Sequence, residues 1–279
     1  MNVSVGVLYG CQRLVRLVGH GPLALHEYRA SFERAYHVAS AAEVLDLAQR
    51  CFWLRANDEG NLYLTDRGLQ LVEIAESDLA LRAQMHDYVE IAQPPWAKKV
   101  PGGRSEAVKV LPAEITQCFD EAGLLGDWDD GLVAWWDKVA QTVRLHRGEE
   151  NLKVGREAER LSLEYEKQRT GCDPIWQSLE SNYSGFDILS IVDERSADPL
   201  RIEVKGTYQP LANAIFSISR NEWITADTTK SYTFHLWLLR QNPKRLINVD
   251  YQVLSPHIPG DRGEGEWEIA RVPFRAFAT

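Results

Sequence analysis

The chain has 279 residues, 44% of them hydrophobic, and carries 31 lysines and arginines against 40 aspartates and glutamates, a formal net charge of −9. This acidic balance argues against non-specific coating of nucleic acid or anionic membranes, although it leaves room for a local basic groove. The four cysteines form no CxxC pair, which argues against a disulfide framework and a structural zinc site and indicates reduced thiols in the cytoplasm. No run approaches the roughly 20 apolar residues of a membrane helix, so no membrane association is expected.

The first part expected to fold is a mainly helical domain over residues 1–92. Apolar residues recur at helical spacing from Ser40 to about Phe52, and Ser40 with Glu43 forms the S-x-x-E pattern that begins a helix. A turn, a strand and the cap of another helix follow at Asn57–Gly60, Leu62–Leu64 and Thr65. This outline of helix, hairpin and helix resembles winged helix-turn-helix modules over about residues 25–80.

The helix before the hairpin is expected to present a mixed, slightly acidic surface. Its exposed positions are Glu43, Asp46, Gln49 and Arg50. Because such a face repels phosphate as much as it holds it, we favour a docking or dimerisation role for this domain. A DNA-binding regulator acting through this helix is the weakest interpretation.

The middle region, residues 93–148, is expected to be a linker followed by helices. Residues 93–112 contain four prolines and two adjacent glycines, which disfavour regular structure and predict a linker or irregular loop. The segments EITQCFDEAGLL and DDGLVAWWDKVAQTVRLHR then have helical patterns. Trp135 and Trp136 within the second segment are predicted to be core or interface anchors.

The pattern changes in residues 149–279, where a second domain is expected. A long amphipathic helix, NLKVGREAERLSLEYEKQR, precedes strand-like runs that include DILSIV, LRIEVKG, AIFSIS, YTFHLWLL, INVDYQVL and WEIARVPF. Ser219 and Glu222 form another S-x-x-E capping pattern, so a short helix interrupts the strands. The predicted fold is α+β (mixed α/β), with a mixed sheet flanked by helices.

Charged residues fall on two of these strands. Because side chains alternate on a strand, Glu203 and Lys205 share the face opposite Ile202 and Val204. Asp187 opens the preceding strand, and the turn formers between the two strands can bring it alongside. Buried carboxylates need compensation, and oxygen ligands suit Mg²⁺ or Mn²⁺ better than zinc. The residues therefore predict a hard divalent cation and phosphate chemistry.

The order of these motifs resembles a known superfamily. G-x-x-x-E on a helix (Gly155, Glu159), then G-F-D-I and I-E-V-K, is similar to PD-(D/E)XK nucleases, with Phe186 in place of the proline. Within that superfamily, GFDILS, RIEVKGT and FSISRNEW resemble the NO VEIN C-terminal domain family over about residues 150–255. Members of this family accompany helicases, ATPases and restriction or anti-phage systems.

The resemblance implies a Mg²⁺-dependent DNA endonuclease, with a role in bacterial defence against foreign DNA. It implies that Asp187 and Glu203 hold Mg²⁺ (or Mn²⁺), helped by the main-chain carbonyl of Val204. Glu159 would contribute directly or through a water molecule, and Lys205 would orient or deprotonate the attacking water.

Alternatives remain for individual acids and for the function. Glu157 and Glu166 compete with Glu159, which the four-residue offset from Gly155 favours. Glu222 could complete the site from the following helix, as in some nucleases, but capping explains it without any chemistry and is preferred. The alternative function is a non-catalytic subunit of nuclease fold that docks a partner ATPase or helicase, DNA or a second copy of the chain. An ordinary pair of Glu and Lys on a solvated sheet face is the simplest explanation of E-x-K. The basic residues available to follow a DNA backbone are Arg201, Arg220 and Lys230.

Overall fold

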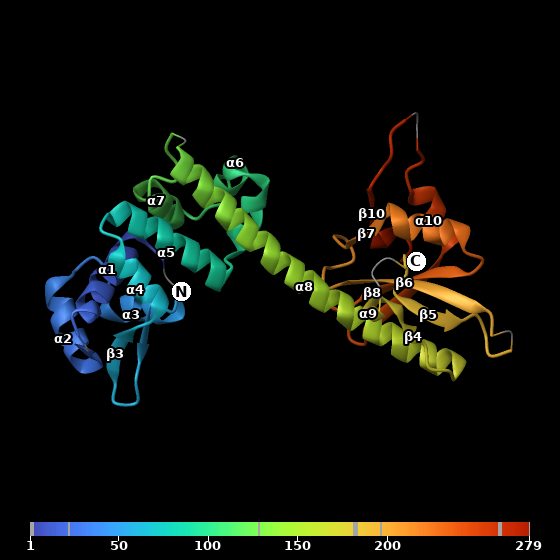
Figure 1. The fold of residues 1–279 in the computed structure, drawn as a ribbon, viewed down its shortest axis with the longest axis horizontal. Helices are drawn as coiled ribbons and strands as arrows, with labels where there is room; N and C mark the ends of the chain where they lie inside the picture. The colour runs from blue at the N-terminus through green and yellow to red at the C-terminus, as the bar shows by residue number, and fades with distance from the viewer. Residues whose placement is uncertain are drawn as a thin grey trace. The chain divides into compact units, whose positions relative to one another are not determined.

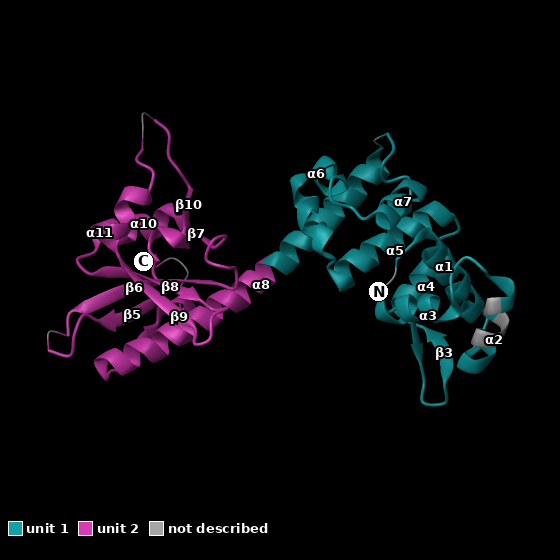
Figure 2. Ribbon diagram, turned by 180° about the vertical axis from the view of Figure 1, so that it is seen from behind, with its two compact units in different colours: residues 1–147 teal, residues 148–279 magenta. Residues whose placement is uncertain are grey.

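The computed structural model describes residues 3–21, 23–127, 129–180, 184–195, 197–261 and 264–278, without the side chains of residues 29–31 and 33. The chain divides into two compact units, residues 1–147 and 148–279 (Figure 2). Helix α8 (Asp130–Thr170) contains the boundary and contributes its first part to one unit and its second part to the other. Among the described residues, no helix has both the length and the apolar sequence that crossing a bilayer requires.

The first unit begins with helices around a small antiparallel sheet of order β1-β3-β2. Its elements are α1 (Val5–Gly19), β1 (Leu23–Ala24), α2 (Leu25–Ala35), α3 (Ala41–Arg50), β2 (Leu54–Ala56), β3 (Asn61–Leu64) and α4 (Asp66–Glu73). The predicted helix after Ser40 is confirmed as α3, with both hydrogen bonds of the capping box to Glu43. The predicted hairpin is confirmed as β2 and β3, and the Thr65 side chain caps α4.

The rest of the first unit corrects one prediction. Residues 93–112 are not a linker: between α5 (Ser77–Ala92) and α7 (Ala113–Glu121) they form η1 (Pro95–Gly102) and α6 (Arg104–Val108). Prolines at the start of η1 sit where a helix lacks partners for its N–H groups, so they begin the helix rather than prevent it. Trp96, Val100 and Ala107 are buried in the core, and the whole stretch clusters with the first unit.

The two tryptophans of α8 anchor this core, as predicted. Trp135 and Trp136 are 8% and 9% exposed, and both rings pack on Phe119. Their Nε1–H groups donate to the carbonyls of Arg82 (2.8 Å) and Leu124 (3.2 Å). Each buried indole thus has the hydrogen-bond partner that it requires.

The second unit is built on a five-stranded sheet of order β4-β5-β6-β8-β9 (Figure 1). The elements after α8 are β4 (Ile175–Trp176), α9 (Gln177–Glu180), β5 (Ile188–Ile191), β6 (Pro199–Thr207), β7 (Ile215–Ser219), α10 (Arg220–Thr228), β8 (Tyr232–Leu238), β9 (Arg245–Asp250), α11 (Tyr251–Leu254), η2 (Ser255–His257), β10 (Ile269–Pro273) and η3 (Phe274–Ala276). The sheet is mixed because β6 and β8 are parallel while the other pairs are antiparallel. The fold class is α+β, as predicted.

One predicted strand ends earlier than expected. The run INVDYQVL was expected to be a single strand, but β9 ends at Asp250 and α11 follows. The Asp250 side chain accepts a hydrogen bond from the Gln252 N–H at 2.8 Å, so it caps the helix and stops the strand.

The two faces of the sheet are covered by different elements. Helix α8 packs through Ala158 on a layer formed by Ile188, Ile202 and Val204. The other face packs with β7, α10 and β10. At Gly206 a Cβ atom would lie 2.7 Å from the Cβ of Ala158, so only glycine lets β6 approach α8 this closely.

Candidate active site

The antiparallel pairing of β5 and β6 determines where Asp187 lies. Ile188 pairs with Ile202, so Asp187, one residue earlier, stands opposite Glu203 on the same face. The Asp187 N–H donates to the Ile202 carbonyl at 2.9 Å, and the Val204 N–H donates to Asp187 Oδ2 at 2.9 Å. Burial raises the pKa of Asp187 to about 6, although the Lys205 charge and the Val204 N–H oppose the shift.

Glu203 and Lys205 form the charged centre of this face, as strand alternation predicted. Lys205 Nζ lies 2.6 Å from Glu203 Oε1 and 3.0 Å from Glu222 Oε1, and the Glu203 side chain is 4% exposed. Burial raises the pKa of Glu203 well above its ordinary value. Burial alone would lower the pKa of Lys205, but the two carboxylates outweigh it and raise this pKa. Lys205 is therefore a firmly protonated cation.

Glu222 is the member of this centre for which the sequence favoured a capping role over a role in the site. The capping box predicted for Ser219 and Glu222 is confirmed, with the Ser219 N–H donating to Glu222 Oε2 at 2.8 Å. The second oxygen of the same carboxylate accepts from Lys205. Burial would raise the pKa of Glu222, but Lys205 and the Ser219 N–H lower it. The only sequence signal for this residue was the S-x-x-E motif directly after a strand. That motif accounts for Oε2, which accepts from Ser219, but not for Oε1, which accepts from Lys205.

Glu159 lies at the edge of the sheet beside Asp187. Glu159 is linked to Asp187 through Ser178, whose hydroxyl donates to Glu159 and whose N–H donates to the Asp187 carbonyl at 3.0 Å. Its Oε2 atom accepts from Arg156 Nη1 at 2.7 Å, from Ser178 Oγ at 2.6 Å and from the indole N–H of Trp176. Among the described residues of this unit, no three acidic, histidine or cysteine side chains have ligand atoms all within 4.8 Å of one another.

The structure thus brings Asp187, Glu203 and Lys205 to one face, with Glu159 adjacent and held by its own donors. The main-chain carbonyl of Val204 belongs to the same segment of β6. The competing acid Glu157 points elsewhere, where it binds Lys244 Nζ and the Tyr208 hydroxyl.

A second buried polar cluster lies on the opposite face of the sheet. Glu166, fully buried, accepts from Arg169 Nε at 3.0 Å and from Ser190 Oγ at 2.6 Å. His235 Nδ1 lies 3.1 Å from Ser162 Oγ, and His235 Nε2 lies 3.7 Å from Glu166 Oε1. Burial lowers the pKa of His235 to about 4 despite the nearby Glu166 charge. The neighbouring Trp237 also donates to Ser162, which closes the cluster.

The three basic residues predicted to follow DNA are differently placed. Arg220 makes two 2.7 Å hydrogen bonds to the carboxylate of Asp261. Lys230 lies 3.4 Å from an oxygen of Asp198. Arg201 donates to a threonine hydroxyl and its guanidinium stands over the Phe186 ring at 5.4 Å. Two of the three charges are thus already paired with acids.

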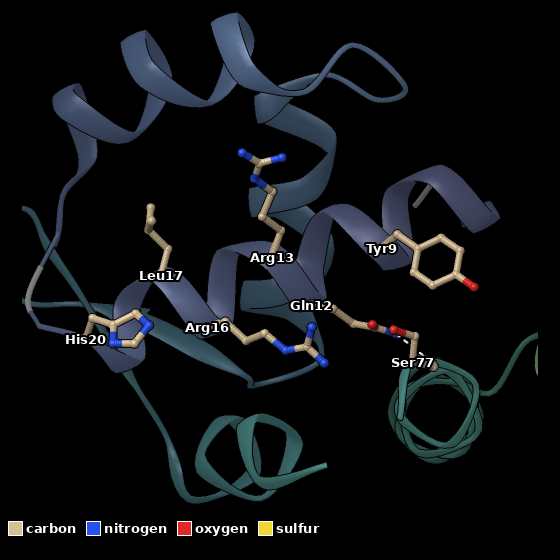
Figure 3. Close-up of a pocket in the computed structure, with 7 residues that line it drawn as sticks. All are labelled: Tyr9, Gln12, Arg13, Arg16, Leu17, His20 and Ser77. Atoms are coloured by element: carbon tan, nitrogen blue, oxygen red, sulfur yellow. Dashed lines mark hydrogen bonds between the residues drawn. The ribbon is translucent and has the colours of Figure 1, made fainter. Parts of the chain in front are cut away.

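Neither of the two cavities described coincides with this centre. The larger, about 410 Å³, lies in the first unit (Figure 3) and is lined by Tyr9, Gln12, Arg13, Arg16, Leu17, His20 and Ser77. It contains no carboxylate that could hold a hard cation. The smaller, about 270 Å³, lies beside β4 and β5 without including Asp187 or Glu203.

One other acidic cluster lies in the first unit. His86, Asp87 and Glu90 have potential ligand atoms within 4.8 Å of one another. Arg67 Nη1 already lies 2.9 Å from Asp87 Oδ1 and 2.9 Å from Glu90 Oε2. A guanidinium thus neutralises this cluster, which does not fit a metal ion.

Comparison with known proteins gives one match. No curated protein and no solved structure matches the chain. Residues 158–247, less than half of the chain, match the family model described as Protein NO VEIN, C-terminal. This stretch contains Glu159, Asp187, Glu203 and Lys205, so the second unit holds a region similar to the C-terminal part of protein NO VEIN.

Proposed function

We propose that the second unit is a metal-dependent nuclease that hydrolyses phosphodiester bonds of DNA. The observation that carries the proposal is the register of β5 and β6, which sets Asp187 opposite Glu203 with Lys205 on the same face. The resemblance to PD-(D/E)XK nucleases and the match to the NO VEIN family support it.

The residues present suit Mg²⁺ or Mn²⁺. The buried Glu203 and the partly buried Asp187 share one face, and desolvation raises the pKa of both, which indicates that one lysine does not fully compensate them. Oxygen donors without histidine or cysteine are the set that these ions prefer. We propose that both carboxylates and the Val204 carbonyl hold the ion, with Glu159 acting directly or through water. When bound, the ion would acidify a coordinated water and neutralise charge on the phosphate.

Lys205 has a narrower role than a general base. Glu203 and Glu222 raise its pKa, which favours a protonated ammonium over a base that takes a proton from water. A fixed cation beside the scissile phosphate stabilises negative charge that develops in the transition state. We propose that Lys205 orients the attacking water and supplies this charge, while Glu203 and Glu222 hold its Nζ in place.

The first unit would act by docking. Its order of α1, β1, α2, α3 and a β2–β3 hairpin suits a winged-helix module. On α3 the exposed Arg50 is paired with Asp46 at 2.8 Å, which leaves little charge for a phosphate backbone. We propose that this module binds a protein, either a partner ATPase or helicase or a second copy of the chain, in a cytoplasmic system that defends bacteria against foreign DNA.

A second candidate is a non-catalytic subunit of nuclease fold. The observation in its favour is that Lys205 lies between two carboxylates, Glu203 and Glu222, so the charges satisfy one another without a ligand. A closed set of this kind could serve stability alone.

The test is cleavage of plasmid, linear duplex and single-stranded DNA, with RNA in parallel, in Mg²⁺ or Mn²⁺. Asp187→Asn removes the charge but keeps an acceptor for the Val204 N–H, so folding should survive. The surface variant Glu180→Gln is the matched control. The proposal predicts cleavage by the wild type and the control and none by Asp187→Asn. Intact substrates with all three proteins, even with a cognate ATPase present, would favour the second candidate.

A further inference from the structure

Basic side chains line one face of the part of α8 that belongs to the second unit. They recur at spacings of three, four and seven residues, which places them on one side of a helix. They are Lys153, Arg156, Arg160 and Lys167, here called the basic stripe. Fourteen residues at 1.5 Å each give a length of about 21 Å. Lys153 and Arg160 are exposed, and the Lys167 side chain is 61% exposed.

One acid of the same helix segment, Glu159, is paired with Arg156 of the stripe at 2.7 Å, and two others are held elsewhere. Glu157 binds Lys244, and Glu166 is buried with Arg169. Lys167 has one exposed partner, Asp173. Among the residues that the structure describes, no carboxylate oxygen lies within 4.0 Å of the Lys153 or Arg160 nitrogens. Two positive charges of the stripe therefore have no ion pair within the described part of the chain, whereas Arg156 and Lys167 are paired.

An aromatic ring fixes part of the stripe next to the candidate active site. The guanidinium carbons of Arg156 and Arg160 lie 5.5 Å and 5.6 Å from the centre of the Trp176 ring. Stacking on an indole restrains an arginine, so less conformational entropy is lost when it binds a phosphate. Trp176 pairs with Ile188 at the edge of the sheet, directly beside Asp187.

We infer that the basic stripe binds the sugar-phosphate backbone of nucleic acid and leads it to the edge of the sheet at Asp187. The identity of the substrate rests on the proposed function, whereas the binding itself does not require cleavage. Within the basic stripe, Lys153 and Arg160 replace Arg220 and Lys230, whose charges are paired with acids, as the main phosphate contacts.

The test measures binding without catalysis. Fluorescence anisotropy of a labelled duplex is followed with the full chain in EDTA between about 50 and 200 mM salt. Lys153→Gln/Arg160→Gln removes two stripe charges. Lys230→Gln/Arg275→Gln removes one lysine and one arginine, both exposed and outside α8, and is the matched control. Each phosphate contact contributes about 0.9 to the slope of log K against log salt, so the stripe variant should lose about 1.8 and the control almost nothing.

The single change Lys153→Gln touches no core residue and should lose about 0.9 of the slope if the double variant misfolds. The charge-conserving Lys153→Arg/Arg160→Lys should restore binding. An unchanged slope in the stripe variant, an equal loss in the control, or a wild type that does not bind would each overturn the inference. Cleavage in Mg²⁺ is measured separately. Binding that depends on the stripe, without cleavage, would reject only the proposed nuclease activity. Cleavage by a protein whose salt dependence of binding does not depend on the stripe would reject only the inferred role of the stripe.

Discussion

Two glutamates are buried on opposite faces of the same sheet, and they are held in very different ways. Glu166 on the α8 face is fully buried and receives hydrogen bonds from Arg169 and Ser190. Glu203 on the α10 face is 3% exposed and receives a hydrogen bond from Lys205, which it shares with Glu222. The two carboxylates are therefore similarly buried, but their charges are compensated to different extents by the donors around them.

The difference indicates which carboxylate is available to a ligand. A buried acid whose oxygens are satisfied by fixed donors stabilises the fold and has little to offer an incoming ion. A buried acid whose pKa is raised by burial lacks compensation, and such groups concentrate at functional sites. Four predictions test this division of roles, beginning with the largest effect.

Exchanging the two glutamates for glutamine should separate catalysis from structure. Glu203→Gln should lower cleavage by about 10³-fold, since an essential electrostatic group is lost. Its free energy of unfolding should stay constant or rise by up to about 1 kcal/mol, because removing a poorly compensated buried charge relieves desolvation. Glu166→Gln should retain cleavage per folded molecule. Equal loss of activity in both variants would contradict the comparison.

Truncating Glu166 should show its structural value. Glu166→Ala leaves Arg169 without its carboxylate and opens a hole under β8, so the second unit should lose about 3–5 kcal/mol of unfolding free energy. Hydrogen exchange of the β8 amides in urea reports this unit, whereas tryptophan fluorescence would not, because the nine tryptophans lie in both units. A loss below about 1 kcal/mol would mean that Glu166 is as poorly compensated as Glu203.

Acid should act on the two faces in opposite directions. His235 titrates at about 4 when folded and near 6.5 when unfolded, so its contribution to stability falls as the pH drops through this window. Asp187 titrates at about 6 when folded against an ordinary 3.8, so its protonation stabilises the folded state over much of the same window. Asp187→Asn should therefore lose stability more steeply than the wild type between about pH 6 and 4, by up to about 1.4 kcal/mol per pH unit. Chemical denaturation at several pH values would reveal parallel curves if the idea is wrong.

The double role of Glu222 predicts the smallest effects. Glu222→Gln keeps an acceptor for the Ser219 N–H but removes a charge beside Lys205, so cleavage should fall about tenfold. Ser219→Ala removes only the cap, which should cost about 1 kcal/mol of stability and leave cleavage unchanged. If both variants cleave like the wild type, Glu222 is a cap and nothing more.

Local rules allowed much of this fold to be predicted. Capping boxes identified the first turns of α3 and α10, because a serine with a glutamate three residues later satisfies free N–H groups in any context. Strand alternation put Glu203 and Lys205 on one face for an equally local reason. The same rules failed in residues 93–112, where prolines that usually break structure begin helices instead.

Pairings between distant segments could not be predicted from local pattern. Nothing in the sequence near Glu159 reveals that Trp176 and Ser178 donate to it, since these contacts depend on how β4 returns along the sheet. Glu222 meets Lys205 only because β6 and β8 are parallel and α10 lies in the crossover between them. The restraint of Arg160 by Trp176 arises from the same edge of the sheet.

The missing side chain at Gly206 has a mechanical meaning for the residue before it. The Cβ of Ala158 and the Val154 carbonyl lie so near that α8 and β6 pack in direct contact at Gly206. Lys205 is the preceding residue of that strand. A methyl group at position 206 would push β6 away from α8 and so shift the Lys205 ammonium without contacting it. The position of the charged centre therefore depends on the opposite face of the sheet, where Gly206 has no Cβ atom.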